Sequence, residues 1–209
     1  MTEEEWLTTT SFGQLLSNFA NREYFPESER KLRLLVCAHC RRTESSSSYR
    51  DRQRLAVAEA FADGAASRGQ LLAGRAVNPG KEVDTYEAFL WAATYPSDGK
   101  PSRNSVIVPA LNYFQCLLYQ SRLGYEVGYI RDIFENPFRP TVFSPEWHTD
   151  TVVALARQMY ESRDFSAMPI LADALQDAGC DNTDVLDHCR GPSPHVRGCW
   201  VVDLVLGKQ

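Results

Sequence analysis

The spacing of apolar residues in the last third of the chain constrains the fold more than any other feature. Between Thr149 and Arg163 they recur three and four residues apart, at Val152, Leu155, Ala156, Met159 and Tyr160. From Ser166 to Gly179 the same spacing is repeated by Ile170, Leu171, Ala174, Leu175 and Ala178. Such a period places apolar side chains on one face of an α-helix, whereas a half-buried strand requires strict alternation. These segments therefore predict two amphipathic helices that form a hairpin.

The rest of the chain predicts an all-α fold. Helical spacing recurs in five earlier segments, at about residues 11–19, 28–42, 49–66, 86–93 and 104–123. No stretch has the composition of a flexible linker. Residues 1–209 are therefore expected to form one compact multi-helix domain built from antiparallel helical pairs.

Two segments depart from this period. Three prolines between about residues 134 and 147 push the residue before each of them toward extended geometry, which predicts an irregular connector. We expect this connector to dock on the core through Phe138, Phe143 and Trp147. Residues 199–206 are apolar on nearly every side, so their spacing does not distinguish a buried helix from a buried strand. A helix is favoured, because a lone strand would have no partner.

Charge and cysteine content limit the class of protein. The 22 Lys and Arg residues against 27 Asp and Glu give a net charge of -5, which opposes non-specific binding to nucleic acid or anionic lipid. No apolar run approaches the roughly 18 residues needed to span a membrane, and the acidic N-terminus does not have the form of an export signal. A cytoplasmic location is therefore expected, where the six cysteines would stay as thiols or bind metal.

Two closely spaced groups of soft or borderline metal ligands lie at opposite ends of the chain. Cys37 and Cys40 are three residues apart, and His195 and Cys199 are four apart, so each pair would share one face of a helix. Zinc takes about four nitrogen or sulfur ligands, commonly as two such pairs. The pattern predicts a structural zinc ion held by Cys37, Cys40, His195 and Cys199. The alternative is that these cysteines are packing thiols, since free cysteine is often buried.

No catalytic or cofactor-binding residue is assigned from the sequence. A nucleophile elbow, a Walker loop, an H-E-x-x-H pair and the zinc-deaminase signature are all missing from it. Ser193, His195 and Asp203 have the residue types of a catalytic triad, but their spacing does not establish its geometry. The sequence therefore favours a protein that is not an enzyme.

A group of arginines is the one candidate surface for nucleic acid. It consists of Arg41, Arg42, Arg50, Arg52 and Arg54. These side chains would contact phosphate or form a solvated face. The aromatic residues that stack on bases are not interleaved with them, which favours the solvated face.

Three segments resemble a known family. ERKLRLLVCAHCRR, RDIFENPFRP and LADALQDAGCDNTDVLDHCRGPSPHVRGCWVVDLVLGK are similar to proteins that occur as many paralogues in planctomycete bacteria. The long C-terminal motif makes the resemblance specific, although residues from about 67 to 122 do not share it. Members often carry cysteine where this chain has His39, so position 39 is either a ligand or a packing site. The resemblance implies no activity and no catalytic residues.

Taken alone, the sequence predicts a non-catalytic helical module for binding or scaffolding, with another protein as partner. The alternative is a zinc-stabilised module with a regulatory or nucleic-acid-associated role. A third hypothesis is an enzyme of unrecognised type. It would require a pocket that joins distant polar residues such as Asp187, His188, His195 and Arg197.

Overall fold

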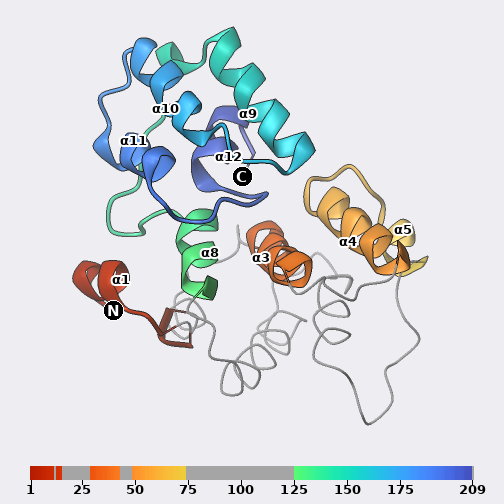
Figure 1. The fold of residues 1–209 in the computed structure, drawn as a ribbon. Helices are drawn as coiled ribbons and strands as arrows, with labels where there is room; N and C mark the ends of the chain where they lie inside the picture. Colours follow the sequence, from red (N-terminus) through yellow and green to blue (C-terminus); the bar gives the residue numbers. More distant parts are fainter. Residues whose placement is uncertain (12, 16–28, 43–48, 74–124, 209) are drawn as a thin grey trace. The chain divides into compact units, whose positions relative to one another are not determined.

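The computed structural model describes residues 1–11, 13–15, 29–42, 49–73 and 125–208 (Figure 1). These residues form helices joined by loops, and no strand occurs among them, which confirms the all-α fold class. The helices predicted at about 86–93 and 104–123 lie outside the described residues. None of the described helices is both long enough and apolar enough to cross a membrane.

The chain divides into two compact units, Met1–Val127 and Gly128–Gln209, and each is described by itself. Compact units can belong to one folding domain. The assignment of residues 1–209 to a single domain therefore stays a prediction, and so does the arrangement of the helices as antiparallel pairs.

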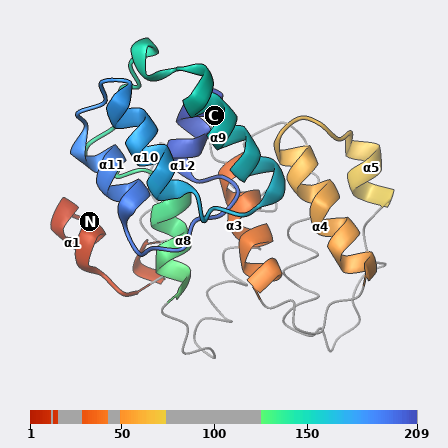
Figure 2. The same ribbon diagram turned by 45° about the horizontal axis from the view of Figure 1, so that its top comes forward.

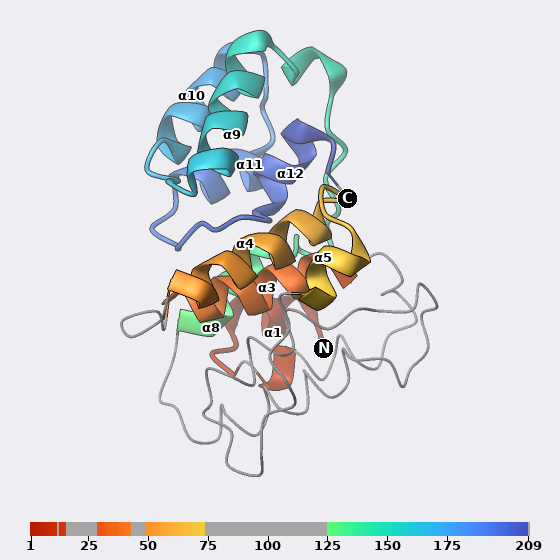
Figure 3. The same ribbon diagram turned by 90° about the vertical axis from the view of Figure 1, so that its right-hand side faces the viewer.

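The N-terminal unit contains four of the described helices: α1 (Glu3–Thr8), α3 (Glu29–Arg42), α4 (Tyr49–Ala62) and α5 (Arg68–Ala73). Helix α1 begins with a capping box, in which the Thr2 hydroxyl accepts from the Glu5 amide and the Glu5 carboxylate accepts from the Thr2 amide. Helices α3 and α4 lie side by side (Figure 3). The helices predicted at about 28–42 and 49–66 are thus confirmed, the second ending at Ala62.

Two of the five arginines considered as a candidate nucleic-acid surface are paired with acids inside the N-terminal unit. Arg41 donates two hydrogen bonds to Glu59, at 2.6 and 3.1 Å, and Glu59 is only 1% exposed. Arg54 is buried and donates to Asp51 at 3.2 Å. A guanidinium held in this way has fewer donors left for phosphate. The structure therefore favours a structural role for Arg41 and Arg54.

The C-terminal unit is built from six segments: α8 (Tyr125–Ile133, which begins in the N-terminal unit), η3 (Pro145–Trp147), α9 (Asp150–Ser162), α10 (Met168–Asp177), α11 (Thr183–Arg190) and α12 (Trp200–Leu206). Thr149 caps α9 by accepting a hydrogen bond from the Val152 amide, and Asn182 caps α11 by accepting from Val185. Helices α10 and α11 pack together, and α12 packs on both α9 and α11 (Figures 1 and 2).

The apolar faces of α9 to α12 form one core. Its buried members include Val152, Ala156, Met159, Tyr160, Leu171, Leu175, Cys199, Trp200, Val201, Val202 and Val205. Ile170 was expected in this core but is 58% exposed. The reason is that α10 begins at Met168 and buries Met168, Leu171, Ala172 and Leu175, which already complete one helical face. Ile170 falls on the opposite side.

The last segment is a helix, as predicted. Helix α12 is buried at Trp200, Val201, Val202, Asp203 and Val205, that is, on nearly all sides. This burial explains why its apolar residues show no single face in the sequence. Gly207 ends the helix with a φ of 62°, in the left-handed region that glycine adopts at little cost.

The Pro-rich connector is irregular between α8 and η3, as predicted. Trp147 is 8% exposed and belongs to the core, and the Phe143 ring meets it edge-on at 5.4 Å. Docking through Phe143 and Trp147 is thus confirmed, and Phe138 is half-buried outside this cluster.

Candidate metal centre

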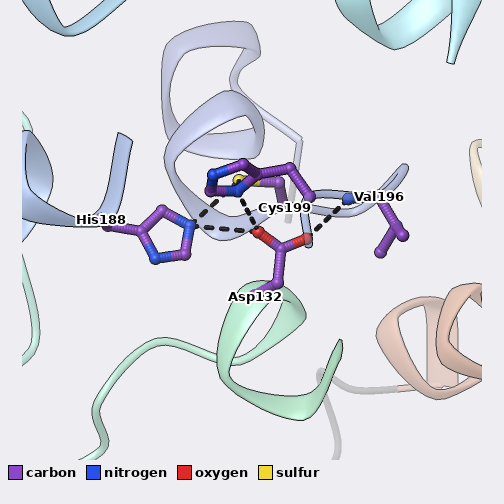
Figure 4. A network of polar contacts seen from close by, with 5 residues as sticks. Asp132, His188, Val196 and Cys199 are labelled. Carbon is purple, nitrogen blue, oxygen red and sulfur yellow. Dashed lines mark hydrogen bonds and ion pairs between the residues drawn. The ribbon is translucent and has the colours of Figure 1, made fainter. Parts of the chain in front are cut away.

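Four potential metal ligands converge in the C-terminal unit (Figure 4). Asp132 lies in the last turn of α8, His188 lies on α11, His195 lies in the loop that follows α11, and Cys199 is the N-cap of α12. One ligand atom from each lies within 4.8 Å of all the others. Within the described part of the chain, this is the one group of His, Cys, Asp and Glu residues with the spacing to hold a metal ion.

The separations between ligand atoms suit a tetrahedral metal ion. His188 Nε2 lies 3.1 Å from Asp132 Oδ1 and 3.3 Å from Cys199 Sγ. His195 Nδ1 lies 2.7 Å from Asp132 Oδ1 and 4.0 Å from Cys199 Sγ. Ligands bound tetrahedrally to zinc at its usual bond lengths are separated by about 3.3 to 3.5 Å. The observed distances range from 2.7 Å, which is shorter than these values, to 4.0 Å, which is longer.

A single hydrogen bond does not account for both contacts of His188 Nε2. His188 Nε2 faces both Asp132 Oδ1 and Cys199 Sγ, yet an imidazole nitrogen either donates one hydrogen or accepts one. If it donates to the carboxylate, it does not accept from the thiol. A cation at the centre would bind both atoms and the ring nitrogen together.

Asp132 is held in place from two sides. Its carboxylate is fully buried, and Oδ2 accepts a hydrogen bond from the Val196 amide at 2.8 Å, while Oδ1 faces the two histidine rings. Burial acts to raise the pKa of this carboxyl, but hydrogen bonds from His188 and His195 and their charges outweigh burial and lower it. The side chain therefore presents an ionised oxygen to the centre.

Cys199 is also fully buried. Burial raises the pKa of its thiol well above the usual value, and the charge of Asp132 raises it further. Without a cation the thiol stays protonated, and a bound metal ion would replace that proton. Cysteine, histidine and aspartate also occur together in nucleophilic active sites. A buried, protonated thiol does not suit that role.

The His195 ring is oriented by Asp132. Nδ1 faces the carboxylate, while Nε2 is buried and has no hydrogen-bond partner among the described residues. Leaving a buried polar atom without a partner costs free energy. The nitrogen that His195 presents to the group is therefore Nδ1. The carboxylate beside His195 is Asp132, and not Asp203 of the triad considered from the sequence.

The structure brings together only part of the ligand set predicted from the sequence. His195 and Cys199 belong to the group, but a loop and a helix N-cap position them, where a shared helical face was expected. Cys37 and Cys40 are buried on α3 in the N-terminal unit and do not belong to it.

Asp132 and His188 complete the group and were not in the predicted set. The sequence singled out His188 for the pocket of an unrecognised enzyme, and it did not single out Asp132. A signal for Asp132 is present in the sequence. It stands among the apolar residues Tyr129, Ile130 and Ile133, where a charged side chain requires a buried partner.

His39, between the two N-terminal cysteines, leads to a pH prediction. Burial lowers its pKa from 6.5 to about 4, and the charge of Arg42 adds to this. The unfolded chain therefore binds a proton on His39 at a higher pH than the folded chain does. The free energy of unfolding that His39 contributes above pH 6.5 is lost as the pH falls toward 4. Chemical denaturation should show a loss of about 2 kcal/mol between about pH 7 and about pH 5.

His39→Gln should remove most of this pH dependence, and His148→Gln should keep it, because His148 is an exposed histidine. Equal pH dependence in the two variants would contradict the prediction.

A scan against protein-family models and searches of curated proteins and solved structures found no match to this chain. The functional argument therefore depends on the geometry of Asp132, His188, His195 and Cys199.

Proposed function

We propose that the chain is a helical binding or scaffolding module whose C-terminal unit is stabilised by one structural zinc ion. The supporting observation is the convergence of Asp132, His188, His195 and Cys199 from α8, α11, the following loop and α12. A structural zinc ion requires this kind of closed set of four ligands, whereas a catalytic one keeps a position open for water or substrate. The burial of Asp132 and Cys199 favours the structural role.

The ligand types favour zinc among the common metal ions. Calcium and magnesium prefer oxygen ligands alone, and copper(I) prefers thiolates and thioethers. A set of one oxygen, two nitrogens and one sulfur in tetrahedral array is suited to zinc, which binds all three elements.

The proposed zinc ion would join α11, the loop and the start of α12 into a rigid body. A rigid helical surface suits a binding or scaffolding role, because a pre-organised surface loses less entropy on binding. Another protein is the expected partner, since the net charge of -5 opposes nucleic acid. The reducing environment of the cytoplasm would keep the described cysteines as the free thiols that they are here.

Metal content tests the proposal directly. Elemental analysis of the full chain, purified without added metal, should find one zinc ion per chain. Cys199→Ala and His188→Ala should lose it. Cys189→Ala is the matched control, because Cys189 is buried in the same core, its pKa is raised to about 12, and it is not in the group. A parent chain without stoichiometric metal, even after incubation with zinc, would refute the proposal.

A further inference from the structure

We infer that zinc occupancy controls the attachment of α8 to the loop between α11 and α12, with Asp132 as the ligand through which the metal holds the helix. This inference rests on the proposed zinc site. It goes beyond that site because it names α8 as the helix whose attachment depends on the bound metal.

Asp132 comes from α8, a helix with no residue in the core cluster of the C-terminal unit. The core cluster contains residues between Trp147 and Val205, and the buried α8 residues Ile130 and Ile133 are not members of it. The other ligands are close to that core: Cys199 belongs to it, and the His188 ring lies 5.0 Å from the ring of Trp200. Apolar packing within this cluster therefore does not hold α8.

The contact between α8 and the loop includes one hydrogen bond and one close approach of the backbone. Asp132 and Gly128 are four residues apart and so share one face of α8. Asp132 accepts from the Val196 amide at 2.8 Å. At Gly128, an added Cβ would lie 3.1 Å from two ring carbons of Pro194, so the loop approaches the helix backbone closely. Asp132 therefore supplies the charged side chain of this contact.

Charge balance makes this contact depend on the metal. A zinc ion carries two positive charges, and the Asp132 carboxylate and the Cys199 thiolate would supply two negative ones. The bound site is then neutral, as a site that excludes water requires. When zinc leaves, the buried Asp132 carboxylate loses the attraction of a divalent cation and keeps only its contacts with His195 and the Val196 amide on the loop.

Hydrogen exchange at the Val196 amide measures this attachment, because that amide donates to Asp132. NMR of the full-length chain would follow it with zinc bound and after chelation. We expect exchange of the Val196 amide to accelerate on chelation at least about tenfold more than exchange of the amides in α9 and α10. Asp132→Asn should raise the exchange rate at Val196 even in excess zinc. Asp173→Asn, the same change at a 71% exposed side chain of α10, should not.

The possible outcomes separate the two proposals. A chain that binds no zinc refutes the zinc site and this inference together. A chain that binds one zinc ion, but whose Val196 amide exchanges equally fast with and without it, overturns the inference and leaves the zinc site intact. Equal loss of protection throughout α9 and α10 also overturns it, because zinc would then hold the whole unit. If Asp132→Asn does not fold, the comparison of the parent chain with and without zinc decides.

Discussion

Chelation of zinc is expected to lower the melting temperature of the chain. Zinc that binds only the folded chain stabilises it by about 4 kcal/mol when its free concentration is about 1,000 times Kd. Tryptophan fluorescence is a suitable probe for the thermal melt, because Trp200 packs against the His188 ring at 5.0 Å. The melting temperature should fall on chelation and recover when zinc is restored.

A pair of cysteine variants isolates the metal from ordinary packing. Cys199→Ala should melt at the same temperature with and without chelator, because it lacks the thiolate ligand. Cys189→Ala removes a neighbouring buried thiol from the same core and should remain sensitive to chelator. The zinc explanation would fail if both variants responded equally. Lower pH should also weaken zinc binding, since the Cys199 thiol must lose its proton to bind the metal.

Trp147→Ala is expected to destabilise the chain by about 3 to 5 kcal/mol, the usual cost of removing a large buried side chain. Trp147 is buried in the core cluster and also contacts the Phe143 ring. Urea denaturation of the two proteins measures the difference. Val142→Ala is the control, because this residue of the same connector is 87% exposed and its truncation should change stability by less than about 0.5 kcal/mol. A small loss of stability in Trp147→Ala would show that this ring does not anchor the connector.

Local patterns were sufficient to predict α9, α10 and α12 of the C-terminal unit, whereas α8 and α11 were not predicted. The apolar spacing of residues 149–163 predicted α9, and Thr149 caps it as such a residue should. Helical hydrogen bonds and caps join residues no more than four positions apart, so nearby sequence contains most of the relevant information. Helix α12 was harder to predict, because a helix that is buried on nearly all sides shows no apolar period in its sequence.

The orientation of a helix depends on more than its own residues. Ile170 fits the apolar period of α10 but faces solvent, because α10 buries the face that contains Met168 and Ala172. Which of two overlapping apolar faces is buried depends on how α10 packs against α9 and α11. That packing is a property of the assembled unit, so spacing along one helix does not determine it.

The sequence by itself determined the type of fold and two of the four members of the candidate metal group, His195 and Cys199, which are neighbours along the chain. Only the tertiary structure decided which residues join them. Asp132 precedes His188 by 56 residues and His195 by 63. Cys37 and Cys40 have the right chemistry and spacing, yet the structure does not include them in the group. The physical reason is that a metal ion requires its ligands within a few ångströms in space, and packing of whole helices sets those distances.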